Sequence, residues 1–259
     1  MQFNTLLLHE SEGVLEIKLN RPDRRNAMTA EMQDELIAAL AHAEESSAKV
    51  VMLAGSGASF CAGLDLAELA SMSGKSAAEH VADARRIARL FSALYTLSLP
   101  TIAVVNGPAI AGGAGLAILC DFTLAIPEAK FGFTEVKIGF IPALVSVYLG
   151  LQIGEKRARS LLLTGRLFDA QEAKEIGLVN EIVPAQDLSS RAHLLAHQLM
   201  QNSPAALRAT KQLLLAGSLP LIDAQLERAI QANSSSRENP DFSEGVSAFL
   251  QKRKPGWRS

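Results

Sequence analysis

The sequence predicts an α/β fold in which helices pack on a largely parallel sheet. From residue 5 to residue 183, short aliphatic and β-branched runs alternate with longer segments whose apolar residues recur at helical spacing. A strand–helix–strand order of this kind places successive strands parallel, with the helix packed on the sheet. From residue 187 onward the pattern is helical only. We therefore expect an α/β core over residues 1–186 and a helical C-terminal region over residues 187–259.

Composition and charge narrow the class of protein. Apolar residues make up 48% of the 259 residues and charged residues 20%, as is typical of a globular protein long enough to bury a core. The net charge of −2 gives no bulk attraction to nucleic acid or to a membrane surface, and we expect neither as a partner. Cys61 and Cys120 are too few for a disulfide framework, and we expect both to pack in the core.

Targeting signals are not evident in the sequence. Residues 1–10 lack a basic segment followed by an apolar one, so we expect no secretory signal. No run reaches the roughly 18 apolar residues that a membrane-spanning helix needs. The expected location is therefore the cytoplasm.

The N-terminal elements form a hairpin, a basic loop and a first helix. Residues 5–9 and 14–19 read as paired strands. The polar loop at 20–26 contains three arginines and is either a solvated loop or a basic lip that meets a phosphate-bearing ligand. Thr29 can cap a helix that runs to about residue 45, and a buried strand follows at 49–54.

Two of the strands lead into loops of small residues that open onto helices. The strand at 49–54 is followed by a glycine-rich loop and a short helix at 66–72. After a longer helix at 77–97, the strand at 101–105 enters an Asn106-Gly107 turn, a run of small residues and an apolar helix. Each loop therefore places free backbone N–H groups near a helix N-terminus, where they can bind or stabilise an anion.

Shorter elements follow Asp121. We expect strands at 122–126 and 179–183, and helices at 143–151, 155–163 and from the cap Asp169 to Gly177. The C-terminal helices are expected at 187–201, 205–216, 220–236 and 242–252.

The two small-residue loops predict a specific chemistry when taken together. Two N–H donors from two loops can hold one oxygen, as an oxyanion hole does for a thioester carbonyl that becomes an enolate. That chemistry also needs a nearby carboxylate to move a proton. Glu135, in an apolar neighbourhood between Phe133 and Ile138, is the candidate. Its burial would raise its pKa.

Other chemistries lack their sequence signals. His193 and His197 have helical i, i+4 spacing but no accompanying acid of a metal site, and we expect no metal. Neither a Gly-x-Ser-x-Gly elbow nor a phosphate-binding Gly-Lys-Ser/Thr loop is present. A dinucleotide fingerprint starting at Gly113 fails at its sixth position, which is Ile118.

The chain resembles the enoyl-CoA hydratase/isomerase (crotonase) family over essentially its whole length. The order and spacing of the motifs are specific together, although each motif alone is modest. They are Leu19-Asn20-Arg21-Pro22 with Asn26-Ala27, Phe60 to Leu66, Asn106-Gly107 through Gly112-Gly113, Phe131-Gly132 with Glu135, Gly139 and Ile141-Pro142, Leu163 to Ala173 with Gly177 to Asn180, and Phe249 to Pro255.

The resemblance implies a crotonase-like spiral of ββα units with a helical C-terminal region used in trimer formation, in a homo-trimer or a dimer of trimers. It implies that the backbone N–H groups of Leu64 and Gly112 form the oxyanion hole. Coenzyme A enters as part of an acyl-CoA thioester substrate, and no separate cofactor is implied. The residues implied to bind the thioester are Arg25, Asn26, Ala27, Ala62, Leu64, Asp65, Leu66 and Gly112.

The sequence departs from the family pattern at two places. Hydratases of the family carry a glutamate at the position of Gly115, so Glu135 is the one catalytic glutamate left. One carboxylate can shuttle a proton between Cα and Cγ, and this favours Δ3-to-Δ2 isomerisation of an enoyl-CoA. The residues at 143–147, in place of a glycine-rich turn and a polar pair, predict a bulkier and more apolar pocket wall.

Three alternatives stay open. One is hydration of a 2-enoyl-CoA by Glu135 with an unidentified partner. A second is a non-catalytic acyl-CoA binder on the same fold. A third is another reaction of the superfamily, such as thioester hydrolysis or dehalogenation, which would need a further acidic residue in the pocket.

Overall fold

The centre of the molecule is a six-stranded sheet. The computed structural model describes residues 3–72 and 74–257. The strand order is β1-β2-β3-β4-β6-β9; β1 and β2 form the predicted antiparallel hairpin, and every later pair is parallel. The α/β class with a parallel sheet is therefore confirmed. The strands span Leu6–Ser11 (β1), Val14–Leu19 (β2), Val50–Gly55 (β3), Thr101–Val105 (β4), Phe122–Ala125 (β6) and Glu181–Ile182 (β9).

A second, three-stranded sheet connects the parts of the site. It consists of β5 (Ala109–Ile110), β7 (Lys130–Gly132) and β8 (Leu167–Asp169), in that order. Strands β5 and β7 are parallel, with Ala109 opposite Phe131. The chain segments that leave these two strands, toward Gly112 and toward Glu135, therefore emerge on the same side.

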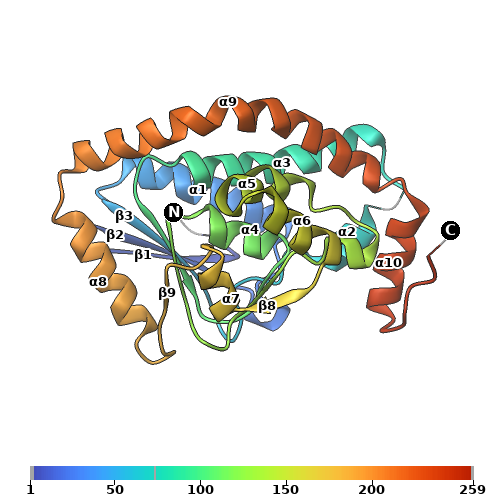
Figure 1. The fold of residues 1–259 in the computed structure, drawn as a ribbon, viewed down its shortest axis with the longest axis horizontal. Coiled ribbons are helices and arrows are strands. Elements are labelled where there is room, and N and C mark those ends of the chain that lie inside the picture. The colour runs from blue at the N-terminus through green and yellow to red at the C-terminus, as the bar shows by residue number, and fades with distance from the viewer. Residues whose placement is uncertain (1–2, 73, 258–259) are drawn as a thin grey trace.

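Helices cover both faces of the large sheet (Figure 1). Alternate strand residues divide between two cores, as the two-residue period of a strand requires. Leu15 and Leu53 pack with α1, α3 and α4, whereas Val14 and Met52 pack under α8. The helices and 3-10 turns are η1 (Pro22–Arg24), α1 (Ala30–Glu45), α2 (Leu66–Ser71), α3 (Ala77–Thr96), α4 (Gly112–Leu119), η2 (Glu135–Ile138), α5 (Ala143–Ile153), α6 (Glu155–Thr164), α7 (Ala170–Glu175), α8 (Leu188–Met200), α9 (Pro204–Ser236) and α10 (Pro240–Leu250).

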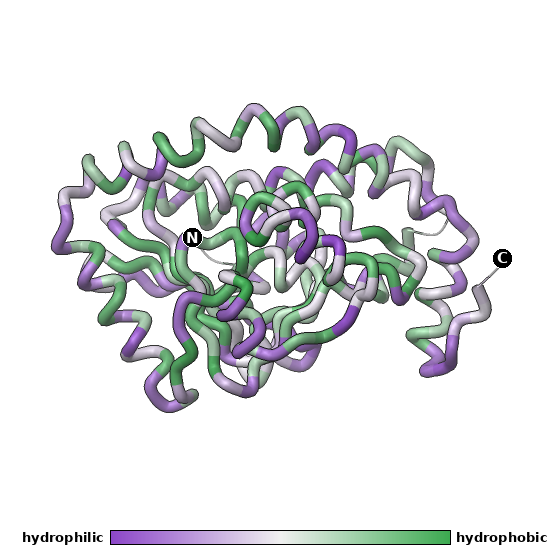
Figure 2. Tube along the Cα trace, in the orientation of Figure 1, coloured by the Kyte–Doolittle hydropathy of each residue, from purple (hydrophilic) through white to green (hydrophobic). Residues whose placement is uncertain are grey.

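The C-terminal helices pack on the α/β core. Helix α8 covers one face of the sheet, α9 runs over α3 and α5, and α10 lies against η2 and α2 (Figure 1). Figure 2 shows hydrophilic and hydrophobic residues interspersed along α9. Within the described residues, no helix has both the length and the apolar character needed to cross a bilayer.

One expectation for this region is wrong. The sequence predicted separate helices at 205–216 and 220–236, but α9 is a single helix of 33 residues that contains Pro220. Proline removes one N–H and crowds the preceding turn, which usually ends or kinks a helix. Here Leu215 and Ile222, on either side of Pro220, are both buried. This packing holds the helix together across the proline.

Candidate active site

The two small-residue loops meet face to face. Cys61 pairs with Ala109 in an isolated parallel bridge, and the Ile110 N–H donates to the Cys61 carbonyl oxygen at 2.9 Å. A Cβ atom at Gly113 would lie 2.2 Å from that same carbonyl oxygen. Glycine is therefore required at this point, because any side chain would push the loops apart. The small residues seen in the sequence allow the two loops to approach each other this closely.

Ala111 turns the chain into α4 through an unusual backbone conformation. Its φ of 53° with ψ of −124° lies in a region that side-chain-bearing residues rarely adopt. The Ala111 N–H donates to the Gly132 carbonyl oxygen at 2.7 Å, so the second sheet holds the strained residue in place. The turn leaves Gly112 as the first residue of α4, with its N–H outside the helical hydrogen-bond pattern.

Leu64 presents the second N–H from the other loop. Met28 bonds to the residues on both sides of Leu64: its N–H donates to the Gly63 carbonyl at 2.7 Å, and its carbonyl accepts from the Asp65 N–H at 2.9 Å. No group of the described chain accepts a hydrogen bond from the N–H of Leu64 or of Gly112. A Cβ atom built on Gly63 would lie 3.5 Å from the Gly112 nitrogen, so the loops that carry the two donors are neighbours.

Glu135 follows β7 at the start of η2 and reaches the same region. Its Oε2 is shielded from solvent and has no hydrogen-bond partner among the described residues. Burial raises the pKa of Glu135 to about 7. A carboxyl group with that pKa exchanges protons readily near neutral pH, which is what a general base that must also return its proton needs.

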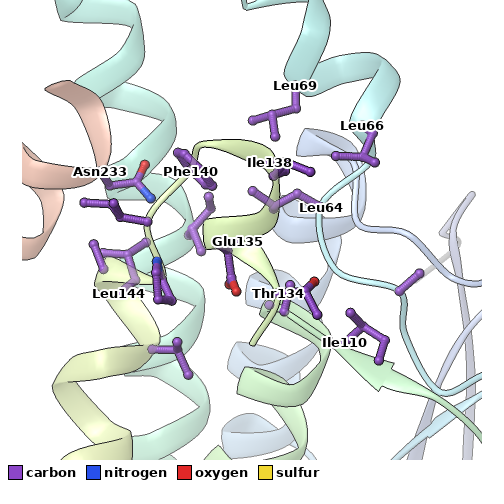
Figure 3. Close-up of a pocket in the computed structure, with 18 of the residues that line it drawn as sticks. Leu64, Leu66, Leu69, Ile110, Thr134, Glu135, Ile138, Phe140, Leu144 and Asn233 are labelled. Atoms are coloured by element: carbon purple, nitrogen blue, oxygen red, sulfur yellow. The ribbon is translucent and has the colours of Figure 1, made fainter. Parts of the chain in front are cut away.

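Glu135 lies in an apolar cavity of about 160 Å³ (Figure 3). Its walls come from α2, α3, η2, α5, α9 and α10, together with the two loops. The predicted bulky apolar wall is present, because Ala143, Leu144 and Val145 all line the cavity. The lining residues that matter most here are Leu64, Ile110, Gly112, Thr134, Glu135, Phe140, Leu144 and Asn233.

Gly115 packs against the ring of Phe91. A Cβ atom at Gly115 would lie 2.7 Å from Cζ of Phe91, a buried side chain of α3 that also lines the cavity. The space beside Gly115 is therefore occupied by a phenyl ring. The position that carries a glutamate in hydratases of the family has no room for one unless this ring moves.

The loops expected to meet coenzyme A lie next to each other. The Ala62 N–H donates to the Arg25 carbonyl at 3.0 Å, and Arg21 forms an ion pair with Asp65 at 3.0 Å. Ala62, Leu64, Leu66 and Gly112 line the cavity, whereas Arg25 is exposed on the adjoining loop and Ala27 is buried behind it.

The Asn26 side chain has a structural role in this loop. It is fully buried, and its amide donates to the carbonyls of Ser56 and Ser59 at 2.9 and 2.8 Å. Its Oδ1 accepts from the Arg21 N–H at 2.9 Å. The side chain therefore ties the basic loop to the small-residue loop that precedes α2. Asn26, which was expected to bind the thioester, has no surface exposed to a ligand.

Other candidates have structural explanations. His193 and Glu16 are paired at 2.8 Å on the surface. No cluster of potential metal ligands occurs in the described part of the chain. Cys61 and Cys120 are buried, and burial raises the pKa of each thiol to about 12.

Two cavity residues were not foreseen as functional. Phe91 was expected only as a core residue of its helix. Asn233 lies in a helical stretch with no motif to mark it, and nothing local in the sequence shows that α9 brings it to the cavity.

The comparisons with known proteins agree with this geometry. The family model described as enoyl-CoA hydratase/isomerase matches residues 9–259. A protein of Thermus thermophilus named "Putative enoyl-CoA hydratase" is 45% identical over 247 residues, which cover 95% of this chain and 98% of that protein. An enoyl-CoA isomerase/hydratase of Mycosarcoma maydis is 33% identical, with coverages of 95% and 93%.

Solved structures show the same fold. The crystal structure of an enoyl-CoA hydratase/isomerase from Xanthobacter autotrophicus superimposes with a TM-score of 0.90 at 30% identity, covering 96% of this chain and 94% of that one. The residues matched by the family model include both small-residue loops, the Glu135 turn and the C-terminal helices. This chain therefore belongs to the enoyl-CoA hydratase/isomerase family.

Proposed function

We propose that this protein moves the double bond of a short-chain 3-enoyl-CoA to the 2-position, with Glu135 carrying the proton. One observation supports this most directly. Among the described residues that line the cavity, Glu135 alone has an ionisable side chain. Isomerisation removes a proton from C2 and adds one at C4 of the same chain, so a single carboxyl group can perform both transfers.

The proposed reaction has two steps. The Glu135 carboxylate takes a proton from C2, and the electron pair moves onto the thioester oxygen, where the N–H groups of Leu64 and Gly112 stabilise the negative charge. The carboxylic acid then donates its proton to C4, the carbonyl re-forms, and the double bond lies between C2 and C3. A pKa of about 7 lets the same group act first as base and then as acid.

Hydration is the second candidate, because the 45% identical relative is named as a hydratase. Adding water to a 2-enoyl-CoA requires a group to orient and deprotonate the water and a group to protonate C2. Gly115 offers no carboxylate and Glu135 is the one ionisable side chain among the described residues of the lining, so Glu135 would have to do both. We therefore propose that hydration is the weaker activity.

The test compares 3-hexenoyl-CoA with crotonyl-CoA. Isomerisation creates the ultraviolet absorbance of the conjugated thioester, whereas hydration removes it, so the two reactions have opposite signals. We expect kcat/KM to be higher for isomerisation, and Glu135→Gln to lower it by about 10²-fold to 10⁴-fold. Crotonyl-CoA hydration that is as fast and survives Glu135→Gln would refute the proposal. Tight thioester binding without turnover of either substrate would favour a non-catalytic binder.

We also propose how the thioester and the subunits are held. Arg25, which is exposed on the basic loop, would meet the phosphate end of coenzyme A, with the buried Asn26 and Ala27 shaping the loop behind it, and Ala62 to Leu66 would follow the pantetheine. The protein would assemble as a homo-trimer or a dimer of trimers; the exposed Leu213 and Leu214 of α9 are available for such an interface.

We also propose a cytoplasmic location. The two buried free thiols, Cys61 and Cys120, fit a reducing compartment of this kind.

A further inference from the structure

One polar side chain interrupts the apolar wall away from the oxyanion loops. Of the described side chains that line the cavity, those of Thr134, Glu135 and Asn233 carry polar atoms. Figure 3 shows Glu135 between Leu64 and Ile110 on one side and Asn233 with Leu144 on the other. An acyl chain that reaches from the oxyanion loops past Glu135 therefore approaches Asn233 with its distal carbons.

Arg237 determines which end of the Asn233 amide faces the cavity. Nη2 of Arg237 donates to Oδ1 of Asn233 at 3.1 Å. A guanidinium group has only donors, so the amide oxygen must face the arginine and the NH₂ group must face away from it. The hydrogen bond from Arg237 is the one made by this side-chain amide within the described residues, and its NH₂ group donates to none of them. Asn233, which is 3% exposed, thus brings an unpaired donor to the cavity wall.

Arg237 lies behind the wall and is held through Nη2, whereas its Nε and Nη1 are buried without a partner among the described residues. Its side chain is fully buried, its Nη2 donates to Asp83 Oδ2 at 2.7 Å, and its guanidinium lies 5.6 Å from the centroid of the Phe140 ring. Asp83 is fixed in turn by Arg86 at 3.0 Å. A buried ion pair is seldom needed for stability, because desolvation offsets most of the attraction. Here the Arg237–Asp83 ion pair holds the guanidinium group beside Oδ1 of Asn233, and so the Asn233 amide cannot flip.

We propose that Asn233 recognises an oxygen atom on the distal part of the acyl chain. The preferred ligands are short acyl-CoA thioesters whose chain carries a hydroxyl, keto or carboxylate oxygen. The inference rests on the proposed function only in that the acyl chain occupies this cavity. The cavity of about 160 Å³ is close in size to a cavity of about 150 Å³ that accepts benzene, so an acyl group of about six carbons fits it.

The physical basis is the cost of an unpaired donor. A plain alkyl chain displaces water from the Asn233 NH₂ group and offers it no acceptor, whereas an oxygen on the chain restores the hydrogen bond. One neutral hydrogen bond of this kind corresponds to about fivefold in affinity. A carboxylate acceptor gives a larger effect because the bond is charge-assisted.

The experiment measures binding of three saturated thioesters by titration calorimetry. Hexanoyl-CoA, 6-hydroxyhexanoyl-CoA and adipoyl-CoA have the same chain and differ at the distal carbon. Because none of them can be isomerised or hydrated, the result does not depend on which reaction the enzyme catalyses. We expect one or both oxygenated thioesters to bind about fivefold or more tighter than hexanoyl-CoA, and their ranking identifies the oxygen as hydroxyl or carboxylate.

Variants separate recognition from folding. Asn233→Asp keeps the contact with Arg237 but removes the N–H donor, so we expect the preference to disappear and adipoyl-CoA to bind worst. Asn233→Leu should reverse the preference, so that hexanoyl-CoA binds most tightly, because a distal hydroxyl or carboxylate is then buried without a donor. Leu144→Met changes the same wall without changing its polarity and should shift the three affinities together.

Two results would overturn the inference. One is that the wild-type protein binds hexanoyl-CoA at least as tightly as both oxygenated thioesters; the other is that Asn233→Asp keeps the wild-type preference. If none of the three thioesters binds, acyl-CoA does not occupy the cavity, and it is the proposed function that fails.

Discussion

At the scale of single residues, the site depends on the buried side chains of Glu135 and Phe91. Glu135 has no partner for its buried oxygen, and its charged form is therefore disfavoured. Phe91 fills the space beside Gly115, a position at which this sequence has no carboxylate. The sequence alone accounts for the missing acid, whereas the raised pKa of Glu135 follows from its burial in the cavity.

The raised pKa of Glu135 makes stability depend on pH. Between pH 4.5 and about 7 the unfolded chain has lost the Glu135 proton while the folded protein keeps it. The free energy of unfolding therefore falls as the pH rises through this range. Because one pKa unit corresponds to about 1.36 kcal/mol, the loss is at most about 3 kcal/mol above pH 7.

Glu135→Gln removes this dependence. We expect the variant to match the wild type at pH 4 and to exceed its free energy of unfolding by up to about 3 kcal/mol at pH 8. Urea unfolding at a series of pH values measures the difference. A gap that is the same at pH 4 and pH 8 would show that burial does not raise the pKa of this group.

At the scale of elements, a capped helix start positions the loop that carries Leu64. The Asp65 side chain accepts from the Ala67 N–H at 3.0 Å and so caps α2 directly after Leu64. Burial opposes ionisation of Asp65, but the Arg21 side chain and the Ala67 N–H outweigh it and hold the pKa of Asp65 below its usual value. The cap and the ion pair together fix the residue next to an N–H donor.

Substitutions of Asp65 separate the cap from the ion pair. Asp65→Ala loses both and should lower the free energy of unfolding by about 1–2 kcal/mol. Asp65→Asn keeps a good capping side chain and should cost less than 1 kcal/mol, roughly the effect of the ion pair alone. Denaturant unfolding measures both values. Equal losses in the two variants would mean that the cap does not stabilise α2.

At the scale of the whole molecule, the C-terminal helix α10 packs against the turn that carries Glu135. Helix α10 crosses η2 so closely that a Cβ atom at Gly245 would lie 2.3 Å from the Ile138 carbonyl carbon. Phe242 of α10 stacks near Phe140, with ring centroids 5.3 Å apart. The position of Glu135 therefore depends on a helix more than 100 residues away in the sequence.

Gly245→Ala tests this dependence. The added methyl group must push α10 away from the backbone of η2, so we expect lower stability, by about 1–3 kcal/mol, and a lower kcat. Gly217→Ala in α9 is the matched control, because its Cβ would meet nothing within 4 Å. That variant should keep full activity and gain up to about 1 kcal/mol from helix propensity. Unchanged kcat in Gly245→Ala would show that α10 does not position Glu135.

Local patterns in the sequence determined the strands of the six-stranded sheet, most helices, the two loops and the candidate role of Glu135, but not the short strands β5, β7 and β8 of the second sheet. Hydrophobic periodicity, capping residues and glycine runs act between near neighbours, so they can be interpreted without the fold. The same reasoning misplaced a break at Pro220, because burial of Leu215 and Ile222 outweighs the local cost of proline.

Only the tertiary structure decided what surrounds the reacting atoms. The ring behind Gly115 comes from α3, and the amide on the cavity wall comes from α9, each far from the loops in sequence. Arg237 and Asp83, which lie 154 residues apart, then determine the direction in which that amide points. Such contacts depend on how whole helices pack, and they cannot be predicted from a short stretch of sequence.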